Sequence, residues 1–71
     1  MTTILIDEQF VSPDDQLYTV TAEAEVDYTN QTVDFYDLEI FSHSLQRLVK
    51  DSTLTSLIIS TLTNKILSDE H

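Results

Sequence analysis

The chain has 71 residues, which is enough for one small domain. Thirteen acidic residues against three basic ones give a formal net charge of −10, and there is no cysteine, glycine or tryptophan. Without cysteine there is no disulfide framework and no thiolate metal site. Without glycine there is no glycine-rich phosphate loop. The negative charge argues against direct binding to nucleic acid or to an anionic membrane, because both call for a basic surface.

The N-terminal residues carry neither the basic segment nor the long apolar segment of a secretory signal. The longest apolar runs are only three residues, at 4–6 and 57–59, whereas a membrane span needs about 20. We therefore expect a soluble, cytoplasmic protein.

The first predicted elements are a brief strand and a turn. Residues 3–6 form a β-branched run that is typical of a short strand, which ends before or at Phe10–Val11. Ser12-Pro13-Asp14-Asp15 then predicts a turn, because proline presets φ and the serine and aspartate side chains bond nearby amides.

Residues 17–28 carry the clearest pattern of the chain. Apolar residues at every even position alternate with threonine and acidic residues at every odd position from 19 to 27. This period of two predicts a strand with one apolar and one acidic face. Residues 29–31 fit a tight hairpin connection, and a further strand starts at Thr32.

The alternation changes phase within this next strand. Val33 and Phe35 have one parity, whereas Leu38 and Ile40 have the other. A β-bulge near Tyr36-Asp37 would restore the register, and a strand with apolar residues on both faces is the alternative. We favour the bulge.

The second half of the chain has helical spacing. Residues 45–49 follow several helix-capping serines and predict a short helix or turn that ends near Lys50. The main helix is expected over residues 53–68, with an apolar residue every fourth position from Leu54 to Ile66. The predicted fold is α+β, with a small antiparallel sheet of about three strands packed on a C-terminal helix. A short helix before the C-terminal one is the first of the two alternatives for residues 45–49. The chain forms one domain (1–71), with an acidic β-hairpin region (1–41) and a helical region (42–71).

Acidic residues are segregated in the first half, where residues 1–41 hold ten acids and no base. Those on the predicted strands are Glu23, Glu25, Asp27, Asp34, Asp37 and Glu39. A hairpin turning at Asn30-Gln31 would place Asp27 directly opposite Asp34, and such like-charge pairs destabilise a sheet. One interpretation is an anionic surface that occupies a cationic groove of another protein. The other is a solvated face of an acidic protein.

Other site chemistry has little support in the sequence. The two histidines, His43 and His71, are not spaced for a metal site with the carboxylates, and no segment matches a calcium-binding loop. No nucleophile motif or glycine-based oxyanion hole is present. We expect no enzymatic activity, no metal and no cofactor.

In size, charge and composition the chain resembles the nucleic-acid-mimicking inhibitors that phages and mobile elements use. Their targets include restriction enzymes, CRISPR effectors and other DNA-binding proteins, and no sequence motif carries the resemblance. It implies a non-enzymatic inhibitor, of anti-CRISPR or anti-restriction type, that acts in the host cytoplasm. Its partner would be a basic, nucleic-acid-binding protein, contacted by the six carboxylates named above.

The alternative is a small homo-oligomeric or adaptor module whose acidic surface serves solubility only. The apolar residues of the predicted helix cover more than half of its circumference, which is more than one core-facing stripe needs. Ile59 and Leu67 would then meet a second copy, as in a homodimer, or another protein.

Overall fold

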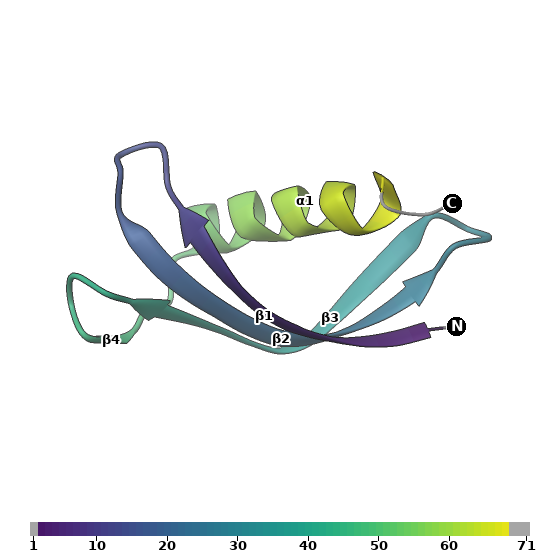
Figure 1. The fold of residues 1–71 in the computed structure, drawn as a ribbon, viewed down its shortest axis with the longest axis horizontal. Coiled ribbons are helices and arrows are strands. Elements are labelled where there is room, and N and C mark those ends of the chain that lie inside the picture. Colours follow the sequence, from purple (N-terminus) through teal and green to yellow (C-terminus); the bar gives the residue numbers. More distant parts are fainter. Residues whose placement is uncertain (1, 69–71) are drawn as a thin grey trace.

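The computed structural model describes residues 2–68, which form an antiparallel sheet with one helix along its concave side (Figure 1). The strands are adjacent in chain order and are β1 (Thr2–Val11), β2 (Leu17–Asp27), β3 (Thr32–Ser42) and β4 (Arg47–Leu48). The helix α1 spans Ser52–Ser68. The predicted α+β class is confirmed, with β4 as a very short fourth strand.

The first hairpin joins β1 and β2 through the predicted proline turn. The Asp15 N–H donates to the Ser12 carbonyl at 2.9 Å, and the Ser12 N–H donates to the Gln16 carbonyl at 2.9 Å. Asp15 closes the turn with a left-handed φ of 69°, a conformation that aspartate tolerates better than most residues. β1 pairs with β2 along its whole length, so the strand reaches Val11, the later of the two ends that the sequence left open.

The second hairpin has a four-residue loop, 28–31, between β2 and β3. An Asp27 carboxylate oxygen accepts from the Thr29 and Asn30 N–H groups at 3.1 and 3.2 Å, and the other accepts from Asn30 Nδ2 at 2.7 Å. These bonds centre the loop at Thr29-Asn30, one residue before the predicted centre at Asn30-Gln31. As a result, Asp27 faces Thr32. The predicted pairing of Asp27 with Asp34 is wrong, and Asp34 lies opposite Glu25.

A β-bulge in β3 accounts for the change of phase seen in the sequence. Thr21 pairs with Glu39 and Glu23 pairs with Tyr36, so two residues of β3 oppose Ala22 alone. Asp37, the first of the two, has a left-handed φ of 54°. The bulge lets Val33 and Phe35 before it, and Ile40 after it, face the same side of the sheet. The preferred prediction is confirmed.

Residues 43–50 form a turn and a short strand, so of the two predictions the turn is correct and the short helix is wrong. The loop 43–46 ends at Gln46, whose left-handed φ of 55° stops the helical turn. The Gln46 N–H donates to the Ser42 carbonyl at 2.8 Å, and Ser42 Oγ accepts from the Leu45 N–H at 3.1 Å. The chain therefore folds back, and β4 pairs with the end of β3. The second half of the chain is thus not helical throughout.

The main helix begins one residue before its predicted start. The Asp51 carboxylate accepts from the Leu54 N–H at 3.0 Å and caps the first turn. Ile58 and Leu62 are buried against the sheet, with Leu54 and Ile66 partly buried beside them. The other buried apolar side chains are Ile6, Val20, Ala22, Ala24, Val26 and Ile40. The core is therefore a single layer between α1 and one face of the sheet.

Candidate functional site

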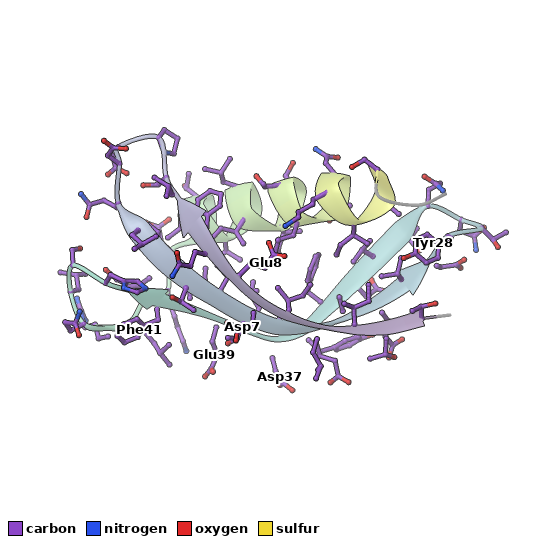
Figure 2. The ribbon with its side chains drawn as sticks, in the orientation of Figure 1. Asp7, Glu8, Tyr28, Asp37, Glu39 and Phe41 are labelled. Atoms are coloured by element: carbon purple, nitrogen blue, oxygen red, sulfur yellow. The ribbon has the colours of Figure 1, made fainter. Side chains whose placement is uncertain are left out.

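The sheet has an outer face, which is the face turned away from α1. Odd-numbered residues of β1 and β2 point to this face, because their even-numbered neighbours form the core. Asp7, Asp37, Glu39 and Phe41 lie on the side of the sheet opposite the helix (Figure 2). No other element among residues 2–68 covers the outer face (Figure 1).

Carboxylates gather in the middle of the outer face. The strand register arranges the outward residues in three neighbouring rows across β1, β2 and β3: Thr3–Glu25–Asp34, Leu5–Glu23–Tyr36 and Asp7–Thr21–Glu39. We call the following residues the acidic face: Asp7, Glu23, Glu25, Asp34, Asp37 and Glu39. All are exposed except Glu25, which is half-buried between its two neighbouring strands. The structure thus brings five of the six predicted residues together and adds Asp7.

Asp27 is the predicted residue that serves another purpose. Its carboxylate is held by the loop that follows it, and the hydrogen bonds from the Asn30 side chain and the Asn30 N–H lower its pKa below the usual 3.8. It lies at the end of β2, next to the loop. We therefore assign Asp27 to loop structure and place it at the margin of the acidic face.

Asp7 was not among the predicted site residues, because the sequence left open whether the first strand continues past Ile6. A pattern that could have revealed it is present. Ile4, Ile6 and Phe10 alternate with outward positions, and this period of two continues past Asp7. The same alternation puts Leu5 on the outer face, where it is 81% exposed.

Tyr36 reports the electrostatic field of the acidic face. Its phenol is 47% exposed and lies in the row of Glu23. The negative charge of Glu25 raises the pKa of Tyr36 above its usual 10.0, with smaller contributions from partial burial and from Asp34. The carboxylates therefore act jointly on a neighbouring group, as expected where no cation separates them.

Two of the three basic residues, Arg47 and Lys65, lie on the helix side of the sheet, and Lys50 lies at the border of the acidic face. Arg47 pairs with Ser42, whose side chain is buried on the helix side, and Lys50 borders a groove beside α1 that Asp37 and Glu39 also line. Lys65 Nζ of α1 contacts a Glu8 carboxylate oxygen at 2.6 Å, with both side chains partly exposed. Glu8 thus lies on the helix face of β1, and its charge is paired with that of Lys65. None of the described outward positions of β1, β2 and β3 holds a lysine or an arginine.

One end of the outer face is less charged. Thr19 Oγ1 and His43 Nε2 share a hydrogen bond of 2.6 Å, and the His43 ring meets Phe41 edge to face with centroids 5.5 Å apart. Leu48 of β4 lies opposite Phe41 and is 53% exposed. His43 is therefore half-buried and bonded within the sheet, and His71 lies outside the described residues.

The helix residues proposed for self-association have mixed surroundings. Ile59 and Leu67 are half-buried, and Leu57 is the large apolar side chain of α1 that is clearly exposed. A groove of about 950 Å³ separates the first turns of α1 from β3 and β4, and Leu38 and Val49 lie in its wall. The role predicted for Ile59 and Leu67 stays a prediction. An Ile59→Asp variant that dissociates an oligomer would support it.

Within residues 2–68, no group of three histidine or acidic side chains has an arrangement that could hold a metal ion. No helix of this part of the chain has the length and apolarity that a bilayer span requires.

Comparison of the chain with protein-family models, curated proteins and solved structures gives no match. The functional argument therefore rests on the residues of the outer face.

Proposed function

We propose that the protein binds a basic, nucleic-acid-binding site of a partner protein through its acidic face and blocks that site as a nucleic-acid mimic. The observation that carries this proposal is the gathering of six carboxylates on one uncovered sheet face that holds no basic side chain. The partner would be a DNA- or RNA-binding protein, and the mimic itself would not bind nucleic acid.

The arrangement is unfavourable for the fold alone. Glu25 and Asp34 are directly opposed on β2 and β3, and like charges in this position destabilise a sheet. Lysine or threonine at either position would remove the repulsion. A cationic partner would offset the repulsion between the two carboxylates when it binds. Binding to such a partner would therefore account for a like-charge pair that lowers the stability of the sheet.

The dimensions suit a site built for phosphates. From Glu25 to the row of Thr21 the acidic face extends about 13 Å along β2, and it spans about 10 Å across three strands, from the usual rise and strand spacing. Carboxylates at these intervals present a row of anionic oxygens as a nucleic-acid backbone does. Their combined field would also speed association with a basic cleft and make binding sensitive to salt.

The inhibition would be steric and electrostatic, with no catalytic step. The acidic face would occupy the basic cleft, and the bulk of the sheet and α1 would block the entry of nucleic acid. Targets of this chemistry include restriction enzymes and CRISPR effectors, which a phage or mobile element would meet in the host cytoplasm.

The experiment that tests the proposal is capture of partners by the immobilised protein from a nuclease-treated host lysate at low salt. Bound proteins are released by a salt gradient and, in a parallel arm, by DNA and RNA oligonucleotides. We expect a nucleic-acid-binding protein that leaves at moderate salt and is displaced by one of the oligonucleotides. Capture of proteins that no oligonucleotide displaces, or of none that salt releases, would contradict the proposal.

A further inference from the structure

Within residues 2–68, the edge of β1 that faces away from β2 has no neighbouring strand. β1 is an outermost strand of the sheet, and it pairs with β2 from Thr2 to Val11 without a bulge. Alternate backbone N–H and C=O groups of such a strand point away from the sheet and are available to another strand. The segment contains no proline and no lysine, which are common protections of a sheet edge.

A small apolar hollow opens at the same edge. It has a volume of about 220 Å³, and its apolar lining comes from Ile4, Ile6, Leu62 and Ile66. Tyr28 and the ion pair of Glu8 with Lys65 complete the lining. Leu5 also borders it, although Leu5 points to the outer face of the sheet. A hollow that contacts residues of both faces of β1 lies at the free edge of the strand, between β1 and α1. Side chains of an added strand would enter it.

We propose that the occupant of this edge is β1 of a second copy, paired antiparallel about a two-fold axis at Leu5. In this register Leu5 meets its own copy on the outer face, and Ile4 meets Ile6 of the other chain on the helix face. Both pairs of isoleucines would then close the two apolar hollows. The dimer would have one continuous sheet with both helices on the same side.

The charges of β1 favour this register over its neighbours. With the axis at Leu5, Asp7 faces Thr3 of the other copy and Glu8 faces Thr2. An axis at Ile6 would put Asp7 against Leu5 and Glu8 against Ile4, and an axis at Asp7 would oppose two carboxylates. An axis at Ile4 would keep the acids apart but would put Leu5 against Thr3 and Ile6 against Thr2. Of these four axes, the one at Leu5 pairs the most apolar residues with each other and keeps the acids apart.

The net charge of −10 on each copy opposes dimerisation at long range. Salt weakens this repulsion, because the screening length falls from about 30 Å at 0.01 M to about 8 Å at 0.15 M. Dimerisation is therefore expected to strengthen as salt is added. The proposed binding of a basic partner responds in the opposite direction, so each proposal can fail without the other.

Analytical ultracentrifugation from micromolar to millimolar protein, at low and physiological salt, tests the dimer. We expect a concentration-dependent dimer that is tighter at physiological salt. Leu5→Asp should weaken it about tenfold or more, because it removes an apolar pair and opposes two carboxylates. Leu45→Asp makes the same change at a residue that is 55% exposed in the loop before β4, and it should leave the dimer intact. Circular dichroism verifies that both variants fold.

Single cysteines test the register directly, because the natural chain has none. Leu5→Cys should form an intermolecular disulfide readily, since residues paired across strands have Cα atoms about 4.5–5.5 Å apart. Thr3→Cys, on the same face of the same strand, should cross-link poorly. With the axis at Leu5, residue 3 faces Asp7 of the other copy, so the two cysteines would be four residues apart along the strands. A monomer under all conditions, a dimer that Leu5→Asp leaves unchanged, or equal cross-linking of both cysteine variants would overturn the proposal.

Discussion

Left-handed backbone conformations mark the turns and the bulge of this chain, which has no glycine to adopt them. Asp15 and Asp37 belong to a residue type that tolerates this region. Gln31 and Gln46 end the two four-residue loops, and each side-chain amide donates to the carbonyl three residues earlier, at 2.8 and 2.6 Å. Side-chain hydrogen bonds thus stabilise the loops where other hairpins use glycine.

Replacing Asp27 by alanine should destabilise the fold at neutral pH, because the carboxylate fixes the loop between β2 and β3. The pKa of Asp27 is lower in the folded chain than in the unfolded one, so its contribution is fully present above pH 3.8. It is lost as the pH falls through the folded value. Urea unfolding should therefore show a difference from the wild type at pH 7 that shrinks in strong acid.

Glu39→Ala is the matched control for this measurement, because it also removes one exposed acid. Its carboxylate makes no hydrogen bond within the described part of the chain. A loss of stability that is equal for the two variants, or that does not change with pH, would show that Asp27 does not hold the loop.

The titration of Tyr36 should report the acidic face residue by residue. Glu25 makes the largest contribution to its raised pKa, so Glu25→Gln should lower the pKa of Tyr36 toward 10.0. Asp7→Asn, at the far side of the acidic face, should change it much less. NMR of the Tyr36 ring as a function of pH measures both effects, and an equal response to the two substitutions would refute this assignment.

Among the elements, β3 depends on its bulge. Asp37→Val should destabilise the fold by about 1–3 kcal/mol, because a β-branched residue is strained at a left-handed φ. Asp37→Asn should change the free energy of unfolding by no more than about 0.5 kcal/mol, since asparagine tolerates the same conformation. Denaturant unfolding of the two variants tests this, and equal stability would mean that residue 37 does not carry the bulge conformation.

Sequence periodicity predicted the long regular elements, since β2 and α1 keep their periods of two and four over many residues. The end of β1 could not be fixed from the sequence because Asp7, Glu8 and Gln9 have low strand propensity, although their alternation fits a strand. The turn at 43–46 resembles a helix start, and only the left-handed Gln46 ends it. Such a conformation is hard to predict without glycine.

Five of the six residues of the acidic face were predicted from the sequence. The wrong pairing between β2 and β3 comes from the loop that joins them. The shift of the β2–β3 register follows from the hydrogen bonds of Asp27, which fix where the loop begins. Sequence spacing alone could not distinguish this loop from one centred one residue later, which shifts the pairing of β3 by two residues. The grouping of Asp7 with the other acids depends on the pairing of β1 with β2, which is a tertiary contact.

At the opposed pair of Glu25 and Asp34, one substitution should change stability and partner binding in opposite directions. Asp34→Lys should stabilise the fold by about 0.2–1 kcal/mol, because it turns a like-charge cross-strand pair into an attractive one. The same substitution should weaken capture of the proposed partner. Urea unfolding and the capture assay, applied to one preparation, measure both. A variant that loses stability, or gains it without losing the partner, would contradict this account.

At the scale of the whole molecule, the two proposed surfaces are compatible. The edge of β1 and the outer face are adjacent, and a two-fold axis at Leu5 would place two acidic faces on the same side of a continuous sheet. Such a dimer would present a longer anionic surface, suited to an extended or two-fold symmetric basic cleft. Higher salt would favour the dimer and weaken its hold on the partner.

The most direct test of the acidic face compares two variants with the same net charge. The face variant carries Glu23→Gln, Glu25→Gln and Asp34→Asn, and the helix variant carries Ser60→Lys, Asn64→Lys and Ser68→Lys. Each changes the charge by three units, but the second does so at exposed positions of α1. The comparison therefore separates the position of the charge from its total amount.

The measurement is the amount of oligonucleotide-displaced protein that each immobilised chain captures from the same lysate. We expect the helix variant to retain the partner at close to the wild-type level, and the face variant to lose it by about tenfold or more, since charges at a contact surface act far more strongly than remote ones. Equal loss in the two variants, or no loss in the face variant, would contradict the account.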